Sequence, residues 1–160
     1  MLVNNLQEDL KKAQLAKDEI KVSTLRMLLS EIHNVEIAKG GSPAGGLSEE
    51  DIIQVIQKEV KKRKEAMEAF KSGGRQEQAQ KEETELHILE SYLPLQLSNE
   101  ELTEIVDQAI TEIGATNIQD LGKVMGNVMS KVVGRADGST VSGKVKERIA
   151  APAPDGAGSQ

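Results

Sequence analysis

The sequence predicts an all-α protein with an N-terminal bundle of about four helices and a smaller C-terminal domain of three helices. Apolar residues recur at helical spacing along nearly the whole chain, and strand-like alternation never persists for more than a few residues. The 160 residues include one Phe, one Tyr and no Trp. A core built only from aliphatic side chains and Met suits helices packed on helices.

Four helices are expected before residue 93. Asp18 and Ser48 are N-cap candidates, and Ser48 with Asp51 resembles a capping box. The glycine-rich stretches at 40–46 and 72–74 break the periodicity and predict loops. The expected helices are one ending near residue 17, followed by 18–40, 48–72 and 76–92.

A boundary between two domains is expected at residues 93–98, because Pro94 disfavours a helical conformation at Leu93. Ser98 with Glu101 then forms a capping box for a fifth helix that ends at Gly114. A sixth helix is expected from about residue 116 to 134, and a seventh over about 141–149. The predicted domains are therefore 1–93 and 98–150, followed by a disordered tail at 151–160.

Composition excludes several classes of protein. Without cysteine there can be no disulfide, no thiolate chemistry and no Cys-containing zinc site. The net charge of −6 argues against a protein coated by nucleic acid. No signal peptide or membrane span is evident, so a cytoplasmic location is expected.

No motif for catalysis, metal binding or cofactor binding stands out, and no catalytic residue, metal or cofactor is expected. His33 and His87 lie on different predicted helices. His87 has Glu83 and Glu90 within reach on the same face; a general base or metal ligand is considered, and a solvated polar face is preferred. The basic run 58–64 has glutamates four residues beyond Lys61 and Lys64, which favours an exposed, salt-bridged helix over a nucleic-acid patch.

The charge of the C-terminal domain is divided along the sequence. Residues 98–120 contain six acidic residues and no Lys or Arg, whereas 121–149 contain six basic residues and two acidic ones. The basic segment could contact phosphates, or it could be neutralised by the acidic fifth helix; both interpretations stay open. The candidate phosphate contacts are Lys123, Lys131, Arg135, Lys144, Lys146 and Arg148.

Glycines mark the sixth helix. Gly122 and Gly126 are four residues apart, and each costs about 1 kcal/mol relative to Ala within a helix, so close packing against a neighbouring helix is expected. The interrupting charges exclude a membrane interface, and the mid-helix position disfavours a phosphate loop. In the following "GRADG", Gly134 is expected to end the helix, and Asp137 with Gly138 to form a turn that presents Arg135. Asp137 is also an N-cap candidate for the last helix.

Four stretches carry a family resemblance: "VIQKEVKKRKEAMEAF", "ESYLPLQLSNEEL", "GKVMG" and "GRADG", in this order. With them the chain resembles the GatB/YqeY family, and more closely the free-standing bacterial YqeY-like proteins, over about residues 1–150. Ser130 departs from the family pattern, where a proline is expected.

The resemblance implies the same all-helical, two-part fold. It also implies kinship with the tail of the B subunit of the tRNA-dependent amidotransferase, which is associated with tRNA binding. The family label of carbon–nitrogen ligase with glutamine as amido-N-donor finds no matching residues here. The leading expectation is a non-catalytic module for tRNA or a tRNA-handling complex. The alternatives are a protein-interaction or self-associating module and, third, an amide-transfer enzyme.

Overall fold

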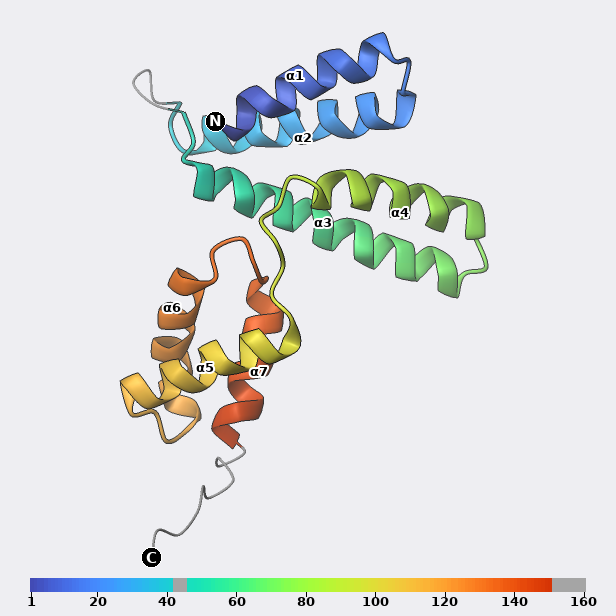
Figure 1. The fold of residues 1–160 in the computed structure, drawn as a ribbon. Helices are drawn as coiled ribbons and strands as arrows, with labels where there is room; N and C mark the ends of the chain where they lie inside the picture. The colour runs from blue at the N-terminus through green and yellow to red at the C-terminus, as the bar shows by residue number, and fades with distance from the viewer. Residues whose placement is uncertain (42–45, 151–160) are drawn as a thin grey trace, which may run out of the picture. The chain divides into compact units, whose positions relative to one another are not determined.

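The structure is a computed structural model that describes residues 1–41 and 46–150. In these ranges the chain forms helices joined by turns and loops, and contains no strand (Figure 1). The predicted all-α class is confirmed. The chain divides into two compact units: unit 1 is Met1–Leu93, and unit 2 begins at Pro94. The expected tail and most of the loop expected at 40–46 lie outside the described residues. Within the described ranges, no helix combines the length and the apolar character that crossing a membrane requires.

Unit 1 consists of two helical hairpins that pack on each other (Figure 1). The helix starts follow the predicted caps: the Asp18 carboxylate accepts the Lys21 N–H, and Ser48 and Asp51 form a complete capping box. The helices are α1 (Leu2–Leu15), α2 (Glu19–Ala38), α3 (Glu49–Ser72) and α4 (Gln76–Glu90).

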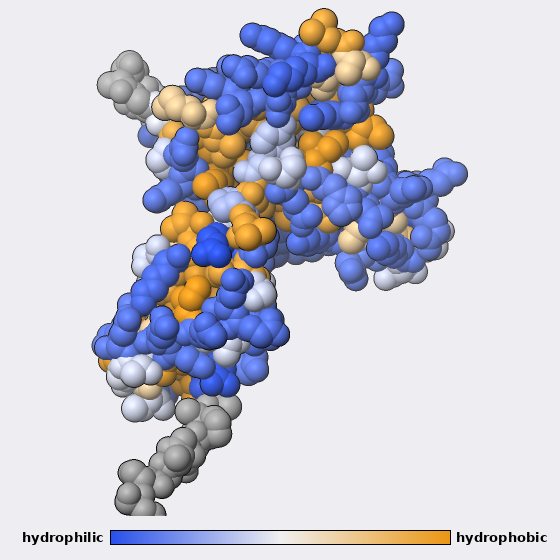
Figure 2. All heavy atoms as spheres, viewed as in Figure 1, coloured by the Kyte–Doolittle hydropathy of each residue, from blue (hydrophilic) through white to orange (hydrophobic). Residues whose placement is uncertain are grey.

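The core of unit 1 is aliphatic, as the composition predicts. All four helices contribute to one cluster of buried Leu, Ile and Val side chains, against which Tyr92 and Leu93 pack after α4 ends. Figure 2 shows hydrophilic residues over most of the visible face of the molecule, with apolar residues visible between the helices. The fully buried members of this cluster are Leu6, Leu25, Leu28, Ile56 and Leu89.

A charged network is also buried in unit 1. Arg63 donates from Nη1 to Glu59 Oε2 at 2.9 Å and from Nε to Glu85 Oε2 at 3.3 Å, and its Nη2 lies 2.6 Å from Met27 Sδ. Only 10% of the Arg63 side chain and 3% of the Glu59 side chain are exposed. Lys62 Nζ donates to the other Glu59 oxygen at 2.7 Å.

This network corrects one interpretation of the basic run 58–64. The run was expected to form an exposed, salt-bridged surface, but Arg63 points inward and joins α3 to α4 through Glu85. Lys64 pairs with Glu90 of α4 at 3.0 Å. The partner of each cation therefore depends on the packing of neighbouring helices as well as on spacing within one helix.

Tyr92 ties the first helix to the end of the fourth. Its hydroxyl donates to Asp9 Oδ2 at 2.8 Å, and the two residues are 83 positions apart. Burial of the side chain raises the pKa of Tyr92, and its hydrogen bond to Asp9 raises it further by a smaller amount. The same hydrogen bond lowers the pKa of Asp9.

Unit 2 packs three helices around a core made largely of valine. These are α5 (Asn99–Ile113), α6 (Leu121–Lys131) and α7 (Gly138–Ala150), with a short 3-10 turn, η1 (Ile118–Asp120), before α6. Ser98 and Glu101 form the predicted capping box, and Gly114 takes a left-handed conformation with φ of 69°. The fully buried valines are Val106, Val124, Val128, Val132, Val141 and Val145.

The predicted start of the sixth helix, near Thr116, is wrong by about one turn, because α6 begins at Leu121. The Asn117 side chain accepts the Gln119 N–H at 2.8 Å, and Asp120 Oδ2 accepts the Thr116 N–H at 3.1 Å. These local side-chain acceptors satisfy backbone groups that a helix would otherwise use, and so favour a turn here.

Candidate functional site

Two of the six predicted phosphate contacts are neutralised by the acidic helix α5. Lys131 Nζ lies 2.9 Å from Glu112 Oε2, and this hydrogen bond lowers the pKa of Glu112. Arg148 forms a two-pronged pair with Asp107, with distances of 2.7 and 2.8 Å, which raises the pKa of Arg148. Of the two uses considered for the basic segment, internal neutralisation therefore accounts for these two cations.

Two further candidates have partners outside α5: Lys144 pairs with a glutamate on its own helix, and Arg135 bonds to a backbone carbonyl. Lys144 Nζ lies 3.2 Å from Glu147 on the same helix, and only 12% of its side chain is exposed. Arg135 Nε donates to the backbone carbonyl of Leu95 at 3.3 Å. Arg135 as a whole is half-buried, and this hydrogen bond ties its side chain back to the Leu95 backbone.

Lys123 on α6 and Lys146 on α7 differ from the other four. Both are exposed, and within the part of the chain that the structure describes neither forms an ion pair. Of the six candidate cations, Lys123 and Lys146 are therefore the two that are both exposed and without an ion pair among the described residues.

The predicted close packing of the α6 glycines within the chain is wrong. A Cβ placed on Gly122 or Gly126 would have no neighbouring heavy atom within 4 Å, and both residues are exposed. The core-facing side of α6 instead carries Val124 and Val128. The two glycines therefore leave the solvent-facing side of α6 without side chains at these positions, and they make no close contact with another of the described helices.

Because nothing occupies the space beside it, Gly126→Ala should stabilise unit 2 by about 1 kcal/mol, the difference in helix propensity. Gly114→Ala should have the opposite effect, about 1 kcal/mol of destabilisation, since φ there is 69°. Urea denaturation of both variants checks the pair. A destabilising Gly126→Ala would indicate a contact that the structure does not contain.

The "GRADG" turn binds the segment that links the two units. Gly134 has φ of 72°, and its carbonyl accepts a hydrogen bond from Gln96 Nε2 at 2.8 Å. The Arg135 carbonyl accepts the Leu97 N–H at 2.9 Å. Asp137 caps α7, as predicted, by accepting the Thr140 N–H at 2.9 Å. The turn predicted at Gly138 is wrong, because this cap lets α7 begin at Gly138, about one turn before the predicted start near residue 141.

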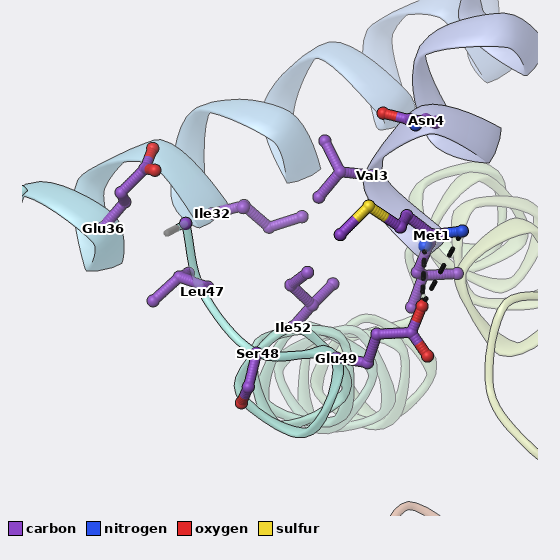
Figure 3. A pocket seen from close by; sticks show the side chains of 11 residues that line it. Met1, Val3, Asn4, Ile32, Glu36, Leu47, Ser48, Glu49 and Ile52 are labelled. Atoms are coloured by element: carbon purple, nitrogen blue, oxygen red, sulfur yellow. Dashed lines mark hydrogen bonds and ion pairs between the residues drawn. The ribbon is translucent and has the colours of Figure 1, made fainter. Parts of the chain in front are cut away.

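Unit 1 contains an apolar pocket of about 470 Å³ that the sequence did not reveal. It lies between the start of α1, the end of α2 and the start of α3, with Val3, Ile32 and Ile52 pointing toward it (Figure 3). Glu49 at its rim pairs with the N-terminal amine. A local signal existed: Leu47 and Ile52 flank the Ser48 cap in the pattern of a hydrophobic staple.

Among the described residues, no group of three or more His, Asp or Glu side chains is arranged to hold a metal ion. His33 and His87 each lie near a glutamate three residues further along the same helix, and 69% of each side chain is exposed. The exposure of His87 agrees with the solvated polar face expected there from the sequence.

Comparison with known proteins places these features in a family. A family model described as "Yqey-like protein" matches residues 3–149. The chain belongs to the YqeY-like family. The match spans nearly all of both units, including Lys123 on α6 and Lys146 on α7 and most of the residues that line the apolar pocket.

Relatives of this YqeY-like chain are fungal proteins named "Altered inheritance of mitochondria protein 41, mitochondrial". The protein from Eremothecium gossypii is 36% identical over 116 residues, which are 71% of this chain and 61% of the relative. The one from Kluyveromyces lactis is 34% identical over 151 residues, 91% of this chain and 75% of the relative. The one from Pyrenophora tritici-repentis is 30% identical over 155 residues, 94% and 82% respectively.

These relatives correct two expectations. The expected cytoplasmic location is contradicted, because the relatives are named as mitochondrial proteins. The narrower assignment to a bacterial subgroup finds no support, because these relatives are fungal. The chain covers less than two thirds of the Eremothecium gossypii protein, so the activity of that whole protein does not transfer directly.

Proposed function

We propose that this YqeY-like protein is a non-catalytic binding module that contacts tRNA, or a tRNA-handling complex, through phosphate contacts from unit 2. The observation that carries the proposal is the pair of exposed lysines without an ion pair in the described structure, Lys123 and Lys146. Kinship with the amidotransferase tail, which the sequence resemblance implies, supplies the class of ligand.

The surroundings of these lysines suit a phosphate backbone. Gly122 and Gly126 lie next to and one turn after Lys123, and Gly143 lies one turn before Lys146. The space beside each of these glycines is unoccupied, since a Cβ placed there would have no neighbouring heavy atom of the described residues within 4 Å. A residue without a side chain allows a ligand to approach the helix backbone closely. Lys131 and Arg148 should contribute less, since α5 already neutralises them.

Replacing Lys123 or Lys146 with alanine should weaken tRNA binding and reduce the salt dependence of the binding constant by about one unit of slope per lysine. The physical reason is that each phosphate contact releases counterions when it forms. Binding is measured as a function of salt concentration for both variants. Lys71→Ala, which removes an exposed lysine of unit 1, is the matched control and should leave the slope unchanged.

Three outcomes would contradict this proposal. The full chain could show no measurable tRNA affinity at low salt, its affinity could be insensitive to salt, or Lys71→Ala could weaken binding as much as the two unit 2 variants do.

A protein-interaction module is the second candidate, and the apolar pocket of unit 1 favours it. A pocket of about 470 Å³ lies within the size range of ordinary ligand sites, and it could take the apolar side chains of a partner. Capture of partners from cell extract with and without RNase separates the two candidates. Partners lost on RNase treatment, and on Lys146→Glu, support phosphate contact; partners that survive both support the pocket.

Glutamine turnover by the purified chain would instead support the carbon–nitrogen ligase label.

A further inference from the structure

Residues 91–98 connect α4 to α5, and the boundary between the two units falls within them, between Leu93 and Pro94; the segment considered next is 94–98, the first residues of unit 2 (Figure 1). The segment contains Leu95, whose side chain is 85% exposed. It has no helical structure, yet hydrogen bonds hold most of it. These bonds decide where along the segment the chain can bend.

The second half of the segment is fastened to unit 2. The Leu97 N–H donates to the Arg135 carbonyl at 2.9 Å, and the Leu97 side chain packs on the unit 2 core. Gln96 Nε2 donates to two carbonyls at once, that of Gly134 at 2.8 Å and that of Pro94 at 2.9 Å. We call this set of contacts, with the Arg135 Nε to Leu95 carbonyl bond, the linker clasp.

The chain before the segment is fastened to unit 1. The Tyr92 hydroxyl is bonded to Asp9 of α1, and the Leu93 N–H donates to the Glu90 carbonyl at 3.0 Å. The Leu93 side chain packs on the unit 1 core. Unit 1 therefore holds the chain as far as Leu93, and the clasp holds it again from Leu95 onward.

We propose that bending between the two units is confined to the chain from Leu93 to Leu95, with the linker clasp as the device that sets this limit. Pro94 restricts the joint further, because its ring fixes φ and disfavours helical backbone at Leu93. Two Cα-to-Cα steps reach about 7 Å at most, so the chain segment that can bend is short. The "GRADG" turn thereby gains a role in linking the units, which does not depend on the proposed RNA contact.

Backbone order in the full chain tests the proposal. In ¹H–¹⁵N heteronuclear NOE measurements, Gln96 and Leu97 should be as ordered as α5, and the Leu97 amide should be protected from hydrogen exchange. Gln96→Glu removes both donated bonds and places a carboxylate beside two carbonyl oxygens. It should raise the Leu97 exchange rate about tenfold, the loss expected for one or two net hydrogen bonds, and lower the NOE of residues 95–97.

Gln108→Glu, on the exposed side of α5, is the matched control and should change neither readout. The proposal is overturned if residues 95–97 of the unaltered chain are already as mobile as a free peptide. It also fails if Gln96→Glu leaves Leu97 exchange unchanged, or if Gln108→Glu accelerates it equally.

Discussion

Replacing Arg63 with alanine should lower the free energy of unfolding of unit 1 by about 3 kcal/mol, because it leaves buried carboxylates without their partner. Arg63 contacts both Glu59 and Glu85 and so holds the two carboxylates together. The estimate is at the low end for a broken buried pair, since Lys62 still pairs with Glu59 in the variant. Urea denaturation followed by NMR resonances of unit 1 measures the change.

Lys64→Ala is the control for Arg63→Ala. It lies on the same helix and pairs with Glu90, but 55% of its side chain is exposed. Such exposed pairs contribute between zero and about 1 kcal/mol. If the two variants unfold with equal free energies, the buried network does not stabilise the packing of α3 against α4.

Leu89→Ala should destabilise unit 1 by about 2–5 kcal/mol, the range for removing a large aliphatic side chain from a packed core. Leu89 is completely buried in α4, in the cluster that joins all four helices. The loss has two parts: the apolar surface that is no longer buried, and the cavity that remains. The same denaturation experiment measures it.

The chain offers an equivalent substitution at an exposed position. Leu95→Ala removes the same atoms from a side chain that is 85% exposed, and should change stability by no more than about 0.5 kcal/mol. A Leu89→Ala variant as stable as Leu95→Ala would mean that the core of unit 1 is not packed as described.

Helix boundaries set by local chemistry could be predicted from the sequence. The capping residues Asp18, Ser48, Ser98 and Asp137 bond to backbone groups within three residues, so the short-range pattern contains the whole interaction. The start of α6 could not be predicted in the same way. The turn before it depends on which of several polar side chains takes each backbone N–H, and spacing alone does not decide this.

The candidate site was harder to predict because its decisive contacts are distant in sequence. Asp107 and Arg148 are 41 residues apart, so the charge count identified a basic segment but could not assign its partners. The four-residue spacing of Gly122 and Gly126 does predict that both lie on one face of α6. Periodicity does not say whether a neighbour covers that face, and here the face is open. The apolar pocket needs three helices in place before it exists.

The hydrogen bond from Tyr92 to Asp9 has a practical consequence for spectroscopy. Tyr92 is the sole tyrosine of a chain without tryptophan, so near-ultraviolet absorption and fluorescence come almost entirely from one side chain. Because that side chain docks α1 against the end of α4, its signal reports the integrity of unit 1. Unfolding of unit 1 can therefore be followed through one native chromophore, whereas far-ultraviolet circular dichroism averages over both units.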